Sequence, residues 1–177
     1  MEAGRGLGRV HVITGPGKGK TTAAFGIALR AAGHGLKVCV IQFMKTGLTT
    51  GETVAIRRIR EIQVYQFGTG RFVDPKNITE DDRRRAQEAI DQAKAFLEKG
   101  GCDVLILDEI NLASYYGLVD REAILSMIRS RKPGIEVVLT GRNAPQEFMD
   151  LADYVSSIDN RKHPFKEGVR ARQGIEW

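Results

Sequence analysis

The chain has 177 residues, of which 42% are hydrophobic and 28% charged, with 20 glycines and a formal net charge of +5. This length and balance are typical of one ordinary α/β domain, and they exclude a fibrous or largely disordered chain. The positive charge fits an anionic ligand, but the basic residues are dispersed apart from Arg83, Arg84 and Arg85, which we interpret as a solvated helix face. We therefore expect no nucleic-acid partner.

Strands and helices are expected to alternate along the chain. Apolar, β-branched runs predict strands at residues 9–14, 37–43, 62–67, 103–107, 135–140 and 154–158, the third and sixth being the weakest. Helical periods predict helices at residues 21–32, 79–99, 120–129 and 145–151. Because the stronger runs are continuous, their strands should be covered on both faces. The pattern predicts a single-domain, doubly wound, mostly parallel sheet.

The sequence also allows expectations about the cellular location of the protein and about its cysteines and histidines. The apolar runs are too short to cross a bilayer of roughly 30 Å, and residues 1–8 lack an apolar signal region, so we expect a cytoplasmic protein with no membrane partner. Cys39 and Cys102 lie in apolar stretches at a spacing that matches no zinc motif, which indicates buried free thiols. His11 and His34 are expected to be structural or solvated.

Three loops should leave the carboxyl ends of the strands, where such sheets bind ligands. They cover residues 15–20, 44–53 and 68–78. The second and third are longer than plain connections require, so we expect them to take part in binding.

The first of these loops has the composition of a phosphate-binding loop. It reads Gly15-Pro16-Gly17-Lys18-Gly19-Lys20-Thr21-Thr22 and leads straight into a helix. Glycines let backbone amides converge on phosphate oxygens, the helix N-terminus adds a positive dipole, and Lys20 adds charge. The standard pattern has glycine where this chain has Thr14, which bears on how the nucleotide lies. The loop predicts ATP binding and a P-loop NTPase-like (RecA-like) domain.

Two acids end the strand predicted at residues 103–107. Asp108 and Glu109 are hard oxygen ligands of the kind that Mg²⁺ or Mn²⁺ prefers. Alone they favour a metal site only moderately over an exposed strand end. Together with the phosphate loop they predict a metal site formed by Thr21, Asp108 and Glu109.

In combination these motifs resemble the P-loop type of ATP:corrinoid adenosyltransferases, over nearly the whole chain from Arg9 to Trp177. That family also has a threonine at the position of Thr14, and its members usually end in an aromatic residue. Further matching segments are residues 40–45, 107–109, 140–142, 151–153, 162–165 and 168–177. The resemblance implies an adenosyltransferase domain over residues 9–177, after a short N-terminal extension at residues 1–8.

The resemblance implies that Co(I) of a corrinoid attacks the ribose C5′ of ATP and releases triphosphate. Co(I) is itself a strong nucleophile, so the protein has to align the reactants and stabilise charge on the leaving group. Lys20, Thr21 and Glu109 would then be catalytic, with Lys18 assisting. The family also implies a nucleotide bound in the reverse sense to other P-loop enzymes, a homodimer, and a flavoprotein or other reductant for the cobalt.

Two features depart from the family pattern. Its best-known members carry two aromatics after the Thr-Gly that corresponds to Thr69-Gly70, whereas residues 71–75 offer Phe72 alone, which we expect to face the corrinoid. The N-terminal segment that can fold over the corrinoid is also nearly absent, since eight residues precede the first predicted strand.

Two alternative functions remain open from the sequence. A phosphotransferase resembling thymidine kinases also pairs a glycine loop with Asp-Glu, but it usually has a zinc lid with paired cysteines, which Cys39 and Cys102 do not form. A non-catalytic ATP-binding switch or nucleic-acid motor subunit would show a basic stripe or an arginine finger, and the scattered charges give that little support.

Overall fold

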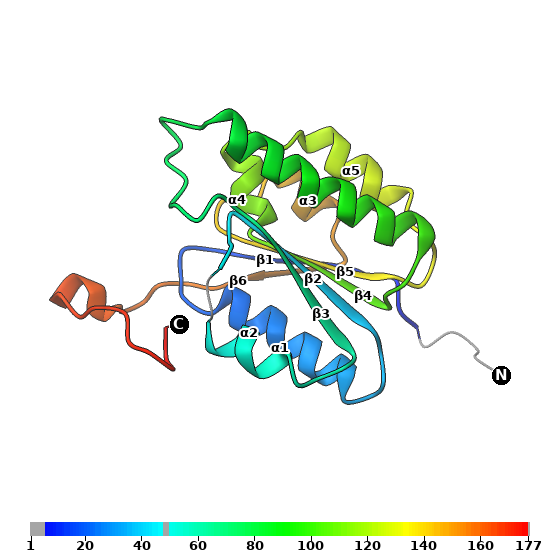
Figure 1. Ribbon diagram of the computed structural model, residues 1–177, viewed down its shortest axis with the longest axis horizontal. Helices are drawn as coiled ribbons and strands as arrows, with labels where there is room; N and C mark the ends of the chain where they lie inside the picture. The colour runs from blue at the N-terminus through cyan, green and yellow to red at the C-terminus, as the bar shows by residue number, and fades with distance from the viewer. Residues whose placement is uncertain (1–5, 48–49, 177) are drawn as a thin grey trace.

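A six-stranded sheet forms the centre of the computed structural model, which describes residues 6–47 and 50–176 (Figure 1). Its strands are β1 (Val10–Thr14), β2 (Val38–Phe43), β3 (Ile62–Phe67), β4 (Val104–Asp108), β5 (Glu136–Thr140) and β6 (Tyr154–Ser157). They lie in the order β3-β2-β4-β5-β1-β6, and every neighbouring pair is parallel. The predicted fold class is confirmed, and the two weaker strands are the two edges.

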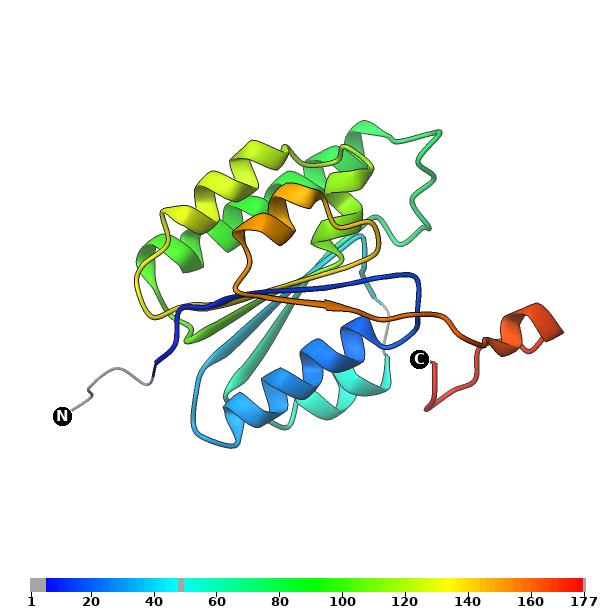
Figure 2. The same ribbon diagram turned by 180° about the vertical axis from the view of Figure 1, so that it is seen from behind.

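Helices cover both faces of the sheet. They are α1 (Lys20–Ala32), α2 (Gly51–Ile56), α3 (Glu80–Lys99), α4 (Ile110–Tyr115), α5 (Arg121–Arg129) and α6 (Gln146–Leu151), followed by the 3-10 helix η1 (Pro164–Glu167). Figures 1 and 2 show α1 and α2 on one face and α3 to α6 on the other. This is the two-sided covering that continuous apolar strands require.

The core is divided by the sheet into two clusters, because successive strand side chains point to opposite faces. On β2, Ile41 packs in the cluster beneath α3 and α5, whereas Val40 packs in the cluster beneath α1. Cys39 and Cys102 are free and buried on the α3 side, as expected. His11 bonds Glu136 at 2.6 Å.

The boundaries predicted for the six strands and for α1, α3, α5 and α6 lie within one residue of the observed ones. For α3, specific residues mark both ends of the helix. At its start the Thr79 hydroxyl accepts from the amide of Asp82, and the Asp82 carboxylate accepts from the amide of Thr79. At its end the helix stops before Gly100, which has φ 81. Within residues 6–47 and 50–176, no helix has the length and apolarity that a membrane span requires.

Two short helices were not predicted. The expected loop at residues 44–53 is wrong at its end, because α2 begins at Gly51, and α4 follows Glu109 directly. Each has six residues, which is less than two turns and too short for a helical period to be recognised. The loop expected at residues 68–78 is irregular, as predicted.

The C-terminal segment runs away from the sheet after β6 and then returns. Figure 1 shows η1 standing off the body, and Glu176 pairs with Lys18 in the loop before α1. Trp177, the aromatic last residue that matches the family pattern, lies outside the described residues.

Candidate active site

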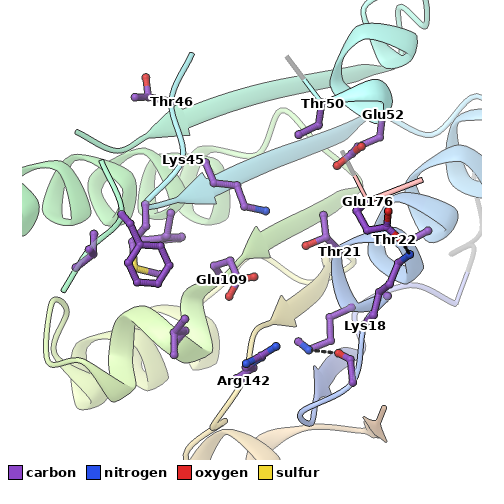
Figure 3. Close-up of a pocket in the computed structure, with 18 of the residues that line it drawn as sticks. Lys18, Thr21, Thr22, Lys45, Thr46, Thr50, Glu52, Glu109, Arg142 and Glu176 are labelled. Carbon is purple, nitrogen blue, oxygen red and sulfur yellow. Dashed lines mark hydrogen bonds and ion pairs between the residues drawn. The ribbon is translucent and has the colours of Figure 1, made fainter. Parts of the chain in front are cut away.

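A cavity of about 1070 Å³ lies beyond the carboxyl ends of the strands. All three predicted loops contribute to it, together with the ends of β4 and β5 and the C-terminal segment (Figure 3). The predicted site residues that line it are Gly17, Lys18, Gly19, Lys20, Thr21, Thr22, Phe72 and Glu109. Gly15 and Pro16 lie in the loop behind this lining, and Asp108 is fully buried beneath it.

The phosphate loop is shaped by the segment after β6 as well as by its own glycines. The amide of Gly17 donates to the carbonyl of Ile158 at 2.7 Å. A Cβ at Gly17 would lie 2.6 Å from that oxygen, so only glycine allows this close approach. Gly19 has φ 112 directly before α1, a conformation that other residues rarely adopt. Sequence reasoning missed the contact with residues 158–159.

Lys20 lies at the centre of this loop. Its ammonium donates to the carbonyls of Gly15 at 2.9 Å and Gly17 at 2.5 Å, and its side chain is buried. Burial lowers the pKa of Lys20, and nearby Arg142 lowers it further. A buried ammonium next to convergent loop amides is well suited to bind a phosphate anion.

Asp108 is the hub of a hydrogen-bond network between strands. Its Oδ1 accepts from the hydroxyls of Thr21 at 2.9 Å and Thr140 at 2.7 Å. Its Oδ2 accepts from the amide of Gln42 and the ammonium of Lys45, both at 2.8 Å. Burial alone would raise the pKa of Asp108, but Lys45 and the donated hydrogen bonds outweigh it and hold that pKa below its ordinary range.

Glu109 points into the cavity and stands in a strained conformation. Its φ is 67, and its amide donates at 3.0 Å to the Thr140 hydroxyl, which itself donates to Asp108. Burial and the neighbouring Asp108 raise the pKa of Glu109, although Lys45, Lys20 and Arg142 oppose the shift. A partly buried carboxylate among cations is well placed to accept a divalent metal.

Backbone strain is concentrated at this edge of the sheet. In the described part of the chain, three non-glycine residues have positive φ: Met44 at 58, Glu109 at 67 and Asn143 at 54. They follow the ends of β2, β4 and β5, and all three line the cavity. Strained residues gathered around one cavity are typical of a functional site.

One wall of the cavity is apolar. It is formed by Met44, Phe72, Val73, Leu112 and Tyr116. Phe72 is 87% exposed, an unusual state for an aromatic residue of a folded domain. Sequence reasoning identified Phe72 and missed Tyr116, because the placement of α4 beside the loop at residues 68–78 depends on tertiary contacts.

The C-terminal segment lies across the phosphate loop. Lys18 pairs with Glu176 at 2.7 Å, and Glu176 also bonds the amide and guanidinium of Arg172. Arg172 and Lys18 hold the pKa of Glu176 far below its ordinary range. Gly174, Ile175 and His163 complete this side of the lining. The matching tail noted in the sequence is thus part of the site.

Among the residues that the structure describes, no group of three or more His, Cys, Asp or Glu side chains is arranged to hold a metal ion. The carboxylate of Glu109 and the hydroxyl of Thr21 are among the oxygen donors that line the cavity. A metal here would therefore take its remaining ligands from phosphate and water, as Mg²⁺ commonly does.

Known proteins of one family match nearly the whole chain. The model of the family described as ATP:corrinoid adenosyltransferase BtuR/CobO/CobP matches residues 6–177. A corrinoid adenosyltransferase of Escherichia coli K12 is 38% identical over 173 residues, which are 96% of this chain and 86% of that relative. Proteins of the same description from a Sinorhizobium species and from Pseudomonas aeruginosa are each 36% identical, covering 96% and 98% of this chain and 80% and 84% of their own lengths. The resemblance in the sequence is confirmed, and the chain belongs to the ATP:corrinoid adenosyltransferase family.

Proposed function

We propose that this protein transfers the 5′-deoxyadenosyl group of ATP to the Co(I) centre of a corrinoid and releases triphosphate. The observation that carries the proposal is the juxtaposition, in one cavity, of a cationic phosphate loop and an apolar wall. The loop suits a triphosphate, and the wall of Phe72, Leu112 and Tyr116 suits the broad, largely apolar face of a corrin ring.

In the proposed reaction a Co–C5′ bond forms and the bond between C5′ and the triphosphate oxygen breaks. Cobalt is oxidised from Co(I) to Co(III), and the electron pair of the broken bond leaves on the triphosphate. Because Co(I) supplies the nucleophile, no protein base is needed. The tasks left for the chain are alignment and stabilisation of the new negative charge.

The charge on triphosphate would be stabilised by Lys20, by the loop amides up to Thr22, and by the N-terminus of α1. Lys18 would join them once a phosphate competes with Glu176 for its ammonium. Thr21 and Glu109 would hold Mg²⁺ or Mn²⁺, which supplies further positive charge at the triphosphate. We assign Asp108 to this metal site through Thr21, because both of its oxygens already accept hydrogen bonds.

Three extensions follow from membership of the family and belong to the proposal. We expect a homodimer, a cytoplasmic location, and a flavoprotein or other reductant that delivers Co(I). The adenosyltransferase domain is expected to cover residues 9–177, and neither nucleic acid nor a membrane is expected as a partner.

The assay is incubation with ATP, Mg²⁺ and chemically reduced cobalamin under anaerobic conditions. We expect the absorption spectrum of adenosylcobalamin to develop together with an equal amount of inorganic triphosphate. Formation of ADP with no change at cobalt would instead support the phosphotransferase alternative and end the proposal. Binding of ATP without formation of any product would favour the second alternative, a non-catalytic ATP-binding switch.

A further inference from the structure

Lys45 enters the cavity from the side opposite to the phosphate loop. It follows β2, which is separated from β1 by β4 and β5 in the sheet order. The left-handed backbone of Met44, at φ 58, turns the chain inward directly before it. In Figure 3 its side chain extends toward Thr21 and Glu109, at the centre of the cavity.

The ammonium of Lys45 is anchored from below. It pairs with Asp108 at 2.8 Å, and the exposed side-chain fractions are 24% for Lys45 and 0% for Asp108. Within the described residues this is its one hydrogen bond, and an ammonium has three donors. Two donors are therefore available to a ligand in the cavity that Lys45 lines. Burial works to lower the pKa of Lys45, but Asp108, Glu109 and Glu52 more than offset it, so the side chain stays charged.

Two glutamines keep the anchor in place. Gln42 donates to Asp108 at 2.8 Å, and Gln66 on β3 donates to Gln42 at 2.9 Å. The carboxylate beneath Lys45 is thus held from β2 and β3 as well as from α1 and β5. A lysine side chain normally loses considerable rotamer freedom when it is ordered, and here part of that cost is met before any ligand binds.

The other cations of the cavity are unequally available. Lys18 is paired with Glu176, and Arg71 is paired with the buried Asp82. Lys20, Arg142 and Lys45 also line the cavity, and the ion pair of Lys45 with Asp108 uses one of the three donors of its ammonium. The charge of a bound triphosphate exceeds what one lysine can neutralise. Of these three side chains, Lys45 is the one that approaches from the β2 side.

We propose that Lys45 is a triphosphate-binding residue, which contacts phosphate oxygens from the side opposite to Lys20 while Asp108 holds its ammonium in place. The inference rests on the proposed function in one respect, since it takes the triphosphate of ATP to lie in this cavity. The contact strengthens as negative charge collects on the leaving group, so Lys45 acts on turnover as well as on binding.

The test is calorimetric titration with inorganic triphosphate in the presence of EDTA, so that metal held by Thr21 plays no part. We expect Lys45→Met to weaken binding about tenfold or more, and Lys45→Arg to retain most of the affinity because the charge is kept. Lys94→Met removes an exposed lysine on α3 and serves as the matched control.

A double variant separates a direct contact from an indirect effect. Lys45→Met alone leaves a buried carboxylate without its cation, which would itself repel an anion. Lys45→Met combined with Asp108→Asn removes both charges, and urea unfolding checks that each variant is folded. Continued weak binding by the folded double variant supports a direct contact, whereas restored affinity overturns it.

Further results of these titrations also test the role of Lys45 in binding triphosphate. Unchanged triphosphate affinity in Lys45→Met overturns the inference, as does an unaltered protein that binds no triphosphate. If triphosphate binds as expected but cobalamin is never adenosylated, the proposed function fails while the role of Lys45 in binding stands.

Discussion

The two sides of the cavity are organised in opposite ways. The phosphate side is tied together at the buried Asp108 of β4, which accepts hydrogen bonds from α1, β2, β5 and Lys45. The apolar side includes an irregular segment at residues 68–78 and the largely exposed ring of Phe72. The side that must stabilise charge is therefore preorganised before ligand binds, whereas the side that must accept a large ring is open.

This difference predicts where substitutions act. On the phosphate side, changes should reduce catalysis or stability strongly, because a preorganised charged network tolerates little loss. On the apolar side, changes should alter affinity for one substrate and leave the fold intact.

The largest effect is expected at Lys20. Lys20→Ala removes the buried ammonium of the phosphate loop, and we expect kcat/KM for ATP to fall by at least about 100-fold. Steady-state adenosylation assays measure this change. Arg84→Ala, on the exposed face of α3 where Arg84 pairs with Asp81 and Glu88, should retain near-normal activity. Equal losses of activity in the two variants would contradict the assignment of Lys20 as a catalytic residue.

The next effect concerns stability. Asp108→Asn leaves the ammonium of Lys45 without its buried partner, and we expect about 3 kcal/mol lower free energy of unfolding near neutral pH. Because the folded-state pKa of Asp108 is lowered, its contribution is present above the unfolded pKa of about 3.9 and is lost as pH falls through the folded value.

Urea unfolding at a series of pH values tests this expectation. The difference between the unaltered protein and Asp108→Asn should be largest near neutral pH and shrink in acid. A difference that is the same at every pH would mean that Asp108 does not contribute through its charge.

The smallest effect is expected at Phe72. Phe72→Ala should raise KM for the corrinoid about three- to tenfold, which corresponds to one lost aromatic contact, with KM for ATP and the unfolding midpoint unchanged. Tyr115→Ala is the control, because Tyr115 is also an exposed aromatic but lies outside the cavity lining. A similar rise in both variants would remove Phe72 from the proposed corrinoid side.

Much of the fold could be predicted because local signals agreed with the tertiary structure. Continuous apolar runs marked the strands, and the Thr79 and Gly100 signals marked both ends of α3. The phosphate loop and the acids after β4 were also recognisable, since their residue types and order follow from the chemistry of anions and metals.

The rest of the site depends on contacts between distant residues. Nothing local to Asp108 reveals that Thr21, Gln42 and Lys45 converge on it, since these residues lie 63 to 87 positions away in the sequence. Likewise the need for glycine at position 17 arises from the carbonyl of Ile158. Such constraints are created by the sheet order, which sequence periodicity does not specify.

The central claim is that the cavity presents C5′ of ATP for attack, so that the bond between C5′ and oxygen breaks. ATP carrying ¹⁸O in the bridge between C5′ and the α-phosphorus tests it most directly, with reduced cobalamin as the second substrate and mass spectrometry of the products. We expect inorganic triphosphate that retains the label, together with adenosylcobalamin. Labelled oxygen left on the adenosine product, or ADP as the phosphate product, would contradict the claim.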